Sequence, residues 1–268
     1  MPIPLLSAVF FPPPPSTFVT AMSVISVVSL ANAGLSEIRG KHLQYSKFWN
    51  ANGAKSSPLA GIKLSGKAGM ALLYVPALVA ALASFVVYPV EDVRFLLICS
   101  ALALHFFKRV FEVLFIHKYS SKVMLESALV ISLSYSLSTA TMIYCQYLSK
   151  DFPEPSINLM YAGVVAFLIG ICGNFYHHYL LSKLRESGSK EYKIPQGGLF
   201  SLVICPHYFF EIFGFLGFTL ISQTLYALSF TMGTIFYLMG RSYVTRKWYA
   251  SKFEDFPKHI KRLIPYVY

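Results

Sequence analysis

Seven long apolar stretches follow one another along the chain, and they constrain its fold more than any other feature of the sequence. Most of them approach the length of about 20 residues that an α-helix needs to cross the hydrocarbon core of a bilayer. The stretches cover residues 17–35, 68–89, 93–116, 124–148, 157–181, 200–221 and 225–240. We therefore predict an all-α, polytopic membrane protein in which residues 1–268 form one seven-helix domain, with residues 241–268 as an interfacial tail.

The composition agrees with a membrane protein. Hydrophobic residues make up 55% of the 268 residues, aromatic residues 16% and charged residues only 13%. A soluble domain carries about 25% charged residues, and disordered chains are poor in aromatics, so both classes are excluded. No basic residue precedes the first apolar stretch, and the first charge of the chain is Glu37. We therefore expect a retained first span rather than a cleaved signal peptide.

Lysine and arginine residues alternate between the two ends of the predicted spans. Segments 36–67, 117–123, 182–198 and 241–268 contain six, two, four and seven of them, whereas each intervening connection has at most one. Because basic loops stay on the cytoplasmic side, we predict a luminal N-terminus and a cytoplasmic C-terminus. The net charge of +11 is thus a sign of topology rather than of a nucleic-acid partner, and it also suits an anionic cofactor.

Ionisable and polar side chains gather at one depth of the predicted spans. With this topology, the cytoplasmic halves hold His105, Lys108, Arg109, Glu112, Asn174, His177, His178, His207, Tyr208 and Glu211. Several of these residues are four apart and share a helix face. Because charged groups inside a membrane are rare, we predict a polar cavity that opens to the cytoplasm. The alternative is that Lys108 and Arg109 reach the interface, with Glu112 as an ion-pair partner, while each histidine only packs.

The connection 182–198 is basic and ends in Gly197-Gly198. Glycines at this place permit a close backbone approach, so the segment is a candidate for phosphate binding, although a plain turn before a helix explains it equally well. No GxGxxG or Walker motif occurs in the chain. The four cysteines lie in apolar runs without metal-ligand spacing, so we predict neither disulfides nor a metal site.

Three motifs resemble the steroid 5α-reductase (3-oxo-5α-steroid 4-dehydrogenase) family, which includes the trans-2-enoyl-CoA reductases. They are Tyr192-Lys-Ile-Pro-Gln-Gly-Gly-Leu-Phe200, Phe253-Glu-Asp-Phe-Pro-Lys258 and Leu263-Ile-Pro265. The resemblance runs from the third apolar stretch to the C-terminus. It implies a multi-pass enzyme of the endoplasmic reticulum membrane that reduces a C=C bond conjugated to a carbonyl, with a lipid substrate and with NADPH bound from the cytoplasmic side.

The resemblance also assigns site residues. It places cofactor-binding positions on Asn174, Arg185, Tyr192, Lys193, Glu211, Arg241 and Tyr249, with Arg109 and Lys118 near the adenosine phosphates. Similarity to the enoyl-CoA reductases makes Tyr208 and Glu112 the candidate catalytic donors to the substrate carbonyl. Tyr74 and His105 are reserve candidates. For Glu112, a structural pair with Lys108 or Arg109 is the competing interpretation.

Departures from the family pattern leave the substrate open. Steroid 5α-reductases carry a Gln-Glu-Leu-Pro run in the second span and a Tyr in the third, which hydrogen-bond the substrate ketone; we assign these positions to Gly69 and Phe106. The segments Lys108–Glu112 and Cys205–Tyr208 instead look like the enoyl-CoA reductase branch. That branch usually has an N-terminal ubiquitin-like domain, which we do not find ahead of the first stretch.

Three functions follow. The first is NADPH-dependent reduction of a 3-oxo-Δ4-steroid-type enone. The second is reduction of a trans-2-enoyl-CoA in very-long-chain fatty-acid elongation, with elongase-complex partners. The third is a non-catalytic seven-helix protein that binds a lipid or acts as a receptor.

Overall fold

The structure, a computed structural model, describes residues 4–41, 62–89, 92–184 and 192–268. Its helices in these ranges are α1 (Pro4–Val9), α2 (Thr17–Ile38), α3 (Gly66–Val87), α4 (Val93–Phe111), α5 (Leu125–Leu148), α6 (Met160–Lys183), α7 (Pro206–Ser222) and α8 (Leu225–Lys252). Helix α4 continues into a π-helical turn, η2 (Glu112–Ile116), and a short 3₁₀ turn, η3 (Gly198–Ser201), precedes α7. The predicted all-α class is confirmed.

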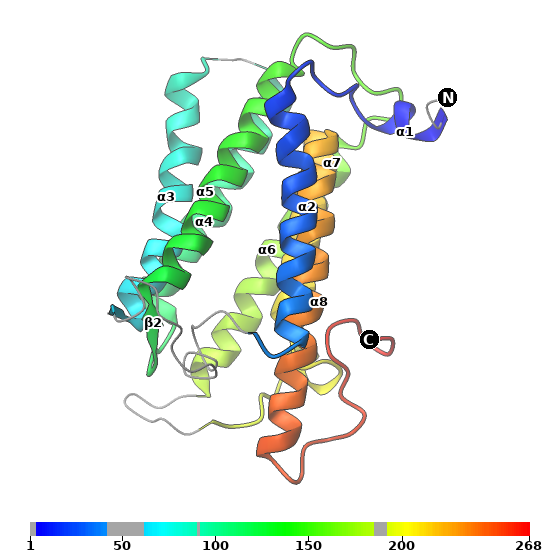
Figure 1. Cartoon of the computed structure of the whole chain (residues 1–268). Helices are drawn as coiled ribbons and strands as arrows, with labels where there is room; N and C mark the ends of the chain where they lie inside the picture. Colours follow the sequence, from blue (N-terminus) through cyan, green and yellow to red (C-terminus); the bar gives the residue numbers. More distant parts are fainter. Residues whose placement is uncertain (1–3, 42–61, 90–91, 185–191) are drawn as a thin grey trace.

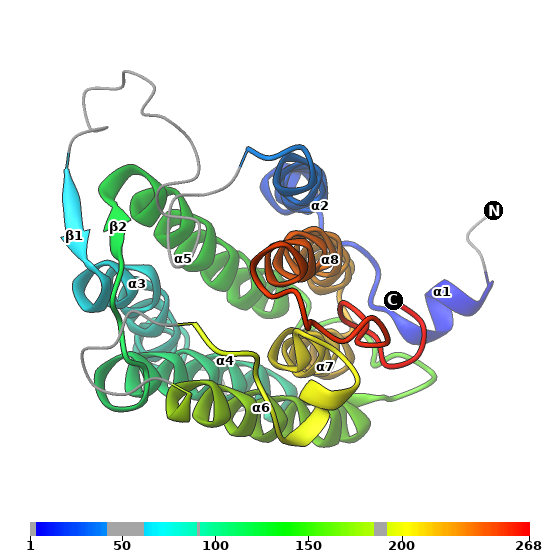
Figure 2. The same cartoon turned by 90° about the horizontal axis from the view of Figure 1, so that it is seen from below.

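The long helices run side by side along one direction, and the short helix α1 projects sideways from one end of this bundle (Figure 1). Three close associations build the bundle: α2 with α8, α6 with α7, and α3 with both α4 and α5. The view along the bundle shows α2, α8 and α7 on one side and α3, α5 and α4 on the other, with α6 next to both α4 and α7 (Figure 2).

Four helices, α2, α3, α5 and α6, are long and apolar enough to cross a membrane. All of them coincide with predicted spans. The other three predicted spans also form helices, but α4 carries three basic side chains, α7 has only 17 residues, and α8 continues into a polar second half.

Side-chain caps explain where several helices begin. The hydroxyl of Ser16 accepts from the backbone N–H of Val19 at 3.3 Å, and the carboxylate of Asp92 accepts from Phe95 at 2.7 Å. Such caps satisfy backbone donors that have no partner within the helix. Helix α7 begins later than predicted, at Pro206, since proline is tolerated only in the first turn of a helix.

Helix α8 continues well past the predicted span end at residue 240, to Lys252. The apolar stretch ends at Arg241, but buried Val244 and Tyr249 keep the later turns packed. Tyr249 packs in a second hydrophobic cluster with Ile204, Phe256 and Leu263. The segment after α8 therefore folds back onto the protein, and Lys261 forms a parallel β-bridge with Val203.

A small β-ribbon was not predicted. Strands β1 (Lys63–Ser65) and β2 (Lys122–Met124) pair antiparallel, with Leu64 opposite Val123. Each strand runs directly into a helix, β1 into α3 and β2 into α5. The ribbon thus fixes the starts of α3 and α5 next to each other, beside the cavity described below.

A polar network closes the end of the bundle at the start of α4. The buried guanidinium of Arg94 pairs with Glu154 and donates to the carbonyl of Ile221 at 2.6 Å and to Oε1 of Gln223 at 3.0 Å. Gln223, in the left-handed conformation with φ 47°, also donates to the carbonyl of Ile157 at 2.9 Å. These bonds join the start of α4, the α5–α6 connection and the α7–α8 turn at one end of the molecule.

Candidate active site

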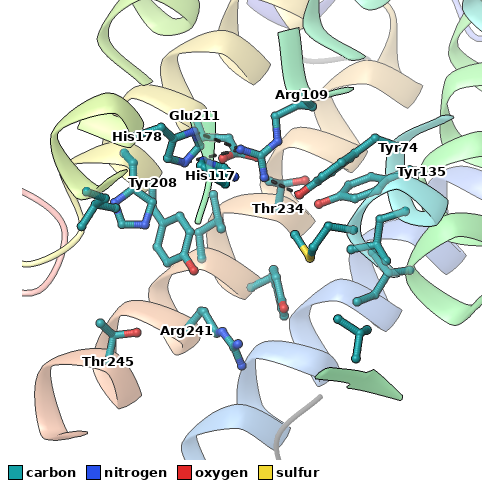
Figure 3. Close-up of a pocket in the computed structure, with 18 of the residues that line it drawn as sticks. Tyr74, Arg109, His117, Tyr135, His178, Tyr208, Glu211, Thr234, Arg241 and Thr245 are labelled. Carbon is teal, nitrogen blue, oxygen red and sulfur yellow. Dashed lines mark hydrogen bonds between the residues drawn. The ribbon is translucent and has the colours of Figure 1, made fainter. Parts of the chain in front are cut away.

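A cavity of about 480 Å³ lies between the helices, toward the end of the bundle opposite Arg94. One part of its wall is apolar and comes from α2, α3, α5 and α8, including Leu30, Leu73, Ile131 and Phe230. The other part is polar and is drawn in Figure 3. It includes Tyr74, Arg109, His117, Tyr135, His178, Tyr208, Glu211, Thr234, Arg241 and Thr245.

The cavity reaches the side of the bundle between α2 and α5. Ser29 on α2 and Val130 and Ser134 on α5 line the cavity and are also exposed. An elongated apolar ligand could therefore lie partly inside the cavity and partly against the lateral face of the molecule.

Arg109 is the centre of the polar wall. Its guanidinium donates to the hydroxyl of Tyr74 and lies 4.6 Å from the centroid of that ring. It also lies 3.2 Å from Glu112 Oε2 and 3.2 Å from His178 Nδ1. Figure 3 shows Arg109 between His178 and Tyr74. The buried cation is thus fixed on both sides and faces the cavity.

Glu112 lies behind this wall rather than in it. The residue is fully buried, and its carboxylate is 3.2 Å from Lys108 Nζ and 3.0 Å from His178 Nδ1. It does not line the cavity, in contrast to Arg109 and His178. This position supports the structural interpretation of Glu112, as the carboxylate that compensates two buried cations.

Asn174 joins three helices. Its side-chain oxygen accepts from Lys108 on α4, while its nitrogen donates to the carbonyl of His207 at 2.8 Å and to Glu211 Oε2 at 3.2 Å on α7. Glu211 lines the cavity and Asn174 does not. Asn174 therefore orients Glu211, and the predicted convergence of α4, α6 and α7 polar groups is present.

The connection after η2 supplies two cavity residues that the sequence analysis did not single out. These residues are His117 and Tyr119, and the distance from His117 Nδ1 to the hydroxyl oxygen of Tyr119 is 3.0 Å. Burial lowers the pKa of His117 to about 4, and the positive charge of Arg109 acts in the same direction. Burial also raises the pKa of the Tyr119 hydroxyl well above its ordinary value. Both groups are therefore neutral hydrogen-bonding groups at pH 7.

His177 holds the Gly197-Gly198 turn. Its Nδ1 is 2.7 Å from the carbonyl of Gly173, and its Nε2 accepts from the backbone N–H of Leu199 at 3.1 Å. Both glycines have positive φ, 84° and 51°, which favours glycine at these positions. The turn leads into η3 and α7, as expected if the two glycines form a plain turn before a helix.

Arg241 faces the cavity from α8, and its Nη1 donates to Glu37 Oε1 at 2.8 Å. Glu37, in the last turn of α2, is buried and is not among the cavity-lining residues. The sequence showed only that Glu37 is the first charge of the chain. Nothing in its surroundings signalled a partner 204 residues away.

Of the predicted cofactor-binding residues, eight lie within the described parts of the chain, and all except Asn174 line the cavity. They are Arg109, Lys118, Tyr192, Lys193, Glu211, Arg241 and Tyr249. Arg185 lies outside the described residues. Tyr192 contacts Trp248, with ring centroids 4.8 Å apart.

Of the candidate donors, Tyr208 and the reserve Tyr74 line the cavity, while Glu112 and the reserve His105 do not. The His105 ring packs among Phe106, Phe215 and Phe218, with ring centroids 5.0 to 5.7 Å away. His105 is therefore a packing histidine. Among the candidate donors, Tyr208 and Tyr74 are therefore the two that a ligand in the cavity would meet.

The assignment of the family Glu to Gly69 needs correction. In a Gln-Glu-Leu-Pro run the Glu stands two residues before the proline, which in this chain is Tyr74 before Pro76. Gly69 instead packs against Val123, where an added Cβ would come within 2.6 Å of the valine Cβ. Tyr74 lines the cavity. The position of the family Glu is therefore taken by a tyrosine, which has a hydroxyl group, and not by a glycine. Phe106, assigned to the family Tyr, packs against Tyr135.

Glu112, His117 and His178 place potential metal ligands within 4.8 Å of one another. The Arg109 guanidinium already contacts the first and the last of them at 3.2 Å. A metal ion there would be repelled by this fixed cation, so we assign the cationic role in the cluster to Arg109.

Comparison with known proteins identifies the family. The profile described as 3-oxo-5-alpha-steroid 4-dehydrogenase matches residues 117–268, which is more than half of the chain. The chain belongs to this family. The resemblance inferred from the motifs is therefore confirmed, and the family match includes the polar wall from His117 onward.

Individual relatives fall into two groups. The chain is 34% identical over 172 residues to a very-long-chain enoyl-CoA reductase of Dictyostelium discoideum, covering 62% of this chain and 55% of that protein. It is 40% identical over 108 residues to the steroid 5-alpha-reductase DET2 of Gossypium hirsutum, covering 40% and 42%. With the human 3-oxo-5-alpha-steroid 4-dehydrogenase 2 it shares 34% identity over 128 residues, covering 47% and 49%. The chain thus matches about half the length of these curated relatives.

Proposed function

We propose that the protein is an NADPH-dependent membrane reductase that saturates a C=C bond conjugated to a carbonyl in a lipid substrate. One observation carries the proposal: within a chain of this family, a single cavity combines a cationic polar wall with an apolar wall that reaches the lateral face of the bundle. This arrangement suits an anionic cofactor at one end and an apolar substrate at the other.

The residues that line the cavity fit the binding of NADPH, a nicotinamide adenine dinucleotide phosphate. Among the described residues, four Lys and Arg side chains line the cavity: Arg109, Lys118, Lys193 and Arg241. Tyr192 and Tyr249 offer aromatic surface in the cavity wall, and Glu211 offers an acceptor for a hydroxyl or amide group. When bound, NADPH supplies the hydride that this chemistry requires.

The protein's own contribution is to stabilise the charge that develops on the substrate carbonyl oxygen. A hydrogen-bond donor aimed at such an oxygen is worth about 2.7–4 kcal/mol of transition-state stabilisation. Tyr208 and Tyr74 are the donors we assign. The hydrogen bond that the Tyr74 hydroxyl accepts from Arg109 polarises its O–H group and so strengthens it as a donor.

The first substrate candidate is a 3-oxo-Δ4-steroid-type enone, and the second is a trans-2-enoyl-CoA. Relatives named as steroid reductases support the first. The second is supported by the enoyl-CoA reductase match, which extends over more of the chain, and by Tyr208 on the cavity wall. The third hypothesis, a non-catalytic lipid-binding protein or receptor, is what an absence of turnover would favour.

We further propose that the single domain of residues 1–268 spans the endoplasmic reticulum membrane seven times, through α2 to α8. The N-terminus is luminal and the C-terminus cytoplasmic. The distribution of basic residues supports this orientation, which places the polar wall of the cavity toward the cytoplasm. If the enoyl-CoA is the substrate, elongase components are the expected partners.

The test is a substrate panel on the purified protein in lipid nanodiscs. We expect loss of NADPH absorbance only when an α,β-unsaturated carbonyl lipid is added. Testosterone and progesterone are compared with a long-chain trans-2-enoyl-CoA, and products are identified by mass spectrometry. Turnover of only one class identifies the substrate. A protein that binds NADPH but turns over neither class would contradict the proposed reaction.

A further inference from the structure

Glu37, in the last turn of α2, forms an ion pair with Arg241, a residue of the cavity wall on α8. The exposed fractions of Arg241 and Glu37 are only 2% and 1%, and the Nη1–Oε1 distance is 2.8 Å. Arg241 lines the cavity and Glu37 does not, so the carboxylate contacts the guanidinium from outside the cavity wall. The two residues therefore differ in what they can offer a ligand.

A purely structural role for this pair is not needed to hold α2 on α8. The two helices already meet through glycine: an added Cβ on Gly34 would come within 2.5 Å of the Phe236 carbonyl, and one on Gly240 would meet the Gly34 backbone. Such close backbone contact is a common way to fix two helices in a membrane. The seam ends one turn before Glu37, which places the carboxylate beside Arg241.

The position of Glu37 is electrostatically unfavourable for a helix residue. A carboxylate in the last turn of a helix lies at the negative end of the helix dipole. Arg241 offsets this effect, and Glu37 in turn offsets a buried cation that faces the cavity. Glu37 therefore lowers the net charge that Arg241 presents to an anionic ligand.

We propose that Glu37 is a positioning residue for Arg241: it fixes the guanidinium in the orientation that receives an anionic group of NADPH, and it moderates the charge that this group meets. The inference rests on the proposed function, since NADPH is the ligand. It adds an α2 residue outside the family-matched segment to the site.

The test measures the Kd for NADPH of three variants in nanodiscs. Glu37→Gln keeps an oxygen that accepts from Arg241 but removes the negative charge, so we expect binding as tight as wild type or tighter. Glu37→Ala removes the contact, and Glu37→Asp withdraws the carboxylate by one methylene. We expect Glu37→Ala to bind NADPH at least about tenfold more weakly than wild type, and Glu37→Asp to bind it about threefold more weakly. The KM of the lipid substrate should be unchanged in all three.

A matched control is Glu154→Gln, which removes the carboxylate of the Arg94 ion pair at the other end of the bundle and should leave NADPH binding unchanged. Damage to the fold alone cannot tighten binding in Glu37→Gln while weakening it in Glu37→Asp. Equal affinities in wild type and the Ala and Asp variants would overturn the inference, as would Glu37→Gln binding as weakly as Glu37→Ala. Wild-type protein that does not bind NADPH would instead reject the proposed function.

Discussion

Tyr74 shows how one residue acquires a chemical role from its neighbours. A tyrosine in an apolar helix usually packs its ring and directs its hydroxyl to a polar partner. Here the ring stacks on Tyr135 with centroids 5.7 Å apart, and the hydroxyl accepts from the buried Arg109. A phenol that accepts a hydrogen bond from a fixed cation is a stronger hydrogen-bond donor than an isolated one, because the cation polarises its O–H bond.

We predict that Tyr74→Phe and Tyr208→Phe separate the two candidate donors. Loss of a donor that contacts the reacting oxygen should lower kcat by about 10²- to 10³-fold and leave the Kd for NADPH within about threefold of wild type. Single-turnover measurements with the preferred substrate of the panel give the rate of the chemical step. Retention of the wild-type rate in one variant would remove that hydroxyl from the mechanism.

The sequence predicted the polar wall better than it predicted individual roles. The topology inferred from the basic loops brought Arg109, Asn174 and Glu211 to one depth, and helical spacing placed each on a face with another polar residue. It could not separate Glu211, which lines the cavity, from Glu112, which lies behind it, because both are four residues from a polar partner. His105 fits the same spacing, yet three phenylalanines surround it, and only the packing reveals this.

At the scale of elements, glycines decide which helices come closest. On α6 an added Cβ at Gly163 would lie within 2.5 Å of the Ile221 backbone nitrogen, and one at Gly170 would meet the backbone of Gly214. On α7 an added Cβ at Gly217 would lie 2.6 Å from Phe167. The pair α6–α7 carries Asn174, His178, His207 and Glu211, so this seam also fixes the site.

Two glycines of that seam give opposite predictions. Gly170→Ala should lower the apparent Tm in nanodiscs by several degrees and reduce NADPH binding, because its methyl group has no space. Gly214→Ala, on the facing helix, points its methyl group into open space, so it should be neutral or stabilise by about 0.5–1 kcal/mol. The contrast between these variants is measured by thermal unfolding, and equal Tm values would contradict the packing described.

Helix positions were largely predictable because apolar length and caps are local signals. The extent of α8 was not, since hydropathy falls at Arg241 while the helix continues to Lys252 on tertiary contacts. The β-ribbon was missed for a similar reason: Lys63–Ser65 has no strand pattern of its own and is ordered by pairing with Lys122–Met124.

At the scale of the whole molecule, the two ends of the bundle differ in chemistry. The end at the start of α4 is closed by the Arg94 network, while the other end holds the cationic wall of the cavity. This polarity matches the seven-span orientation that we propose from the basic loops. A cofactor from the cytoplasm and a substrate from the bilayer could then reach one site by different routes.

The orientation can be tested with single cysteines in a background lacking the four native ones. A cysteine at Lys150 should be labelled by a membrane-impermeant maleimide only after the microsomal membrane is permeabilised. A cysteine at Lys118 should be labelled in intact, right-side-out microsomes. The reverse pattern would show that the cytoplasmic and luminal ends have been exchanged.

The pairing of Glu37 with Arg241 has a consequence for how the protein is made. In the seven-span arrangement that we propose, the carboxylate enters the membrane with the first long helix, while its partner lies 204 residues later in the chain. While the intervening spans are being synthesised, α2 lies at the translocon or in the lipid, and Glu37 near its end cannot yet contact Arg241. Assembly of the bundle can therefore be completed only when α8 emerges, and α2 is the helix for which a membrane chaperone would be most useful.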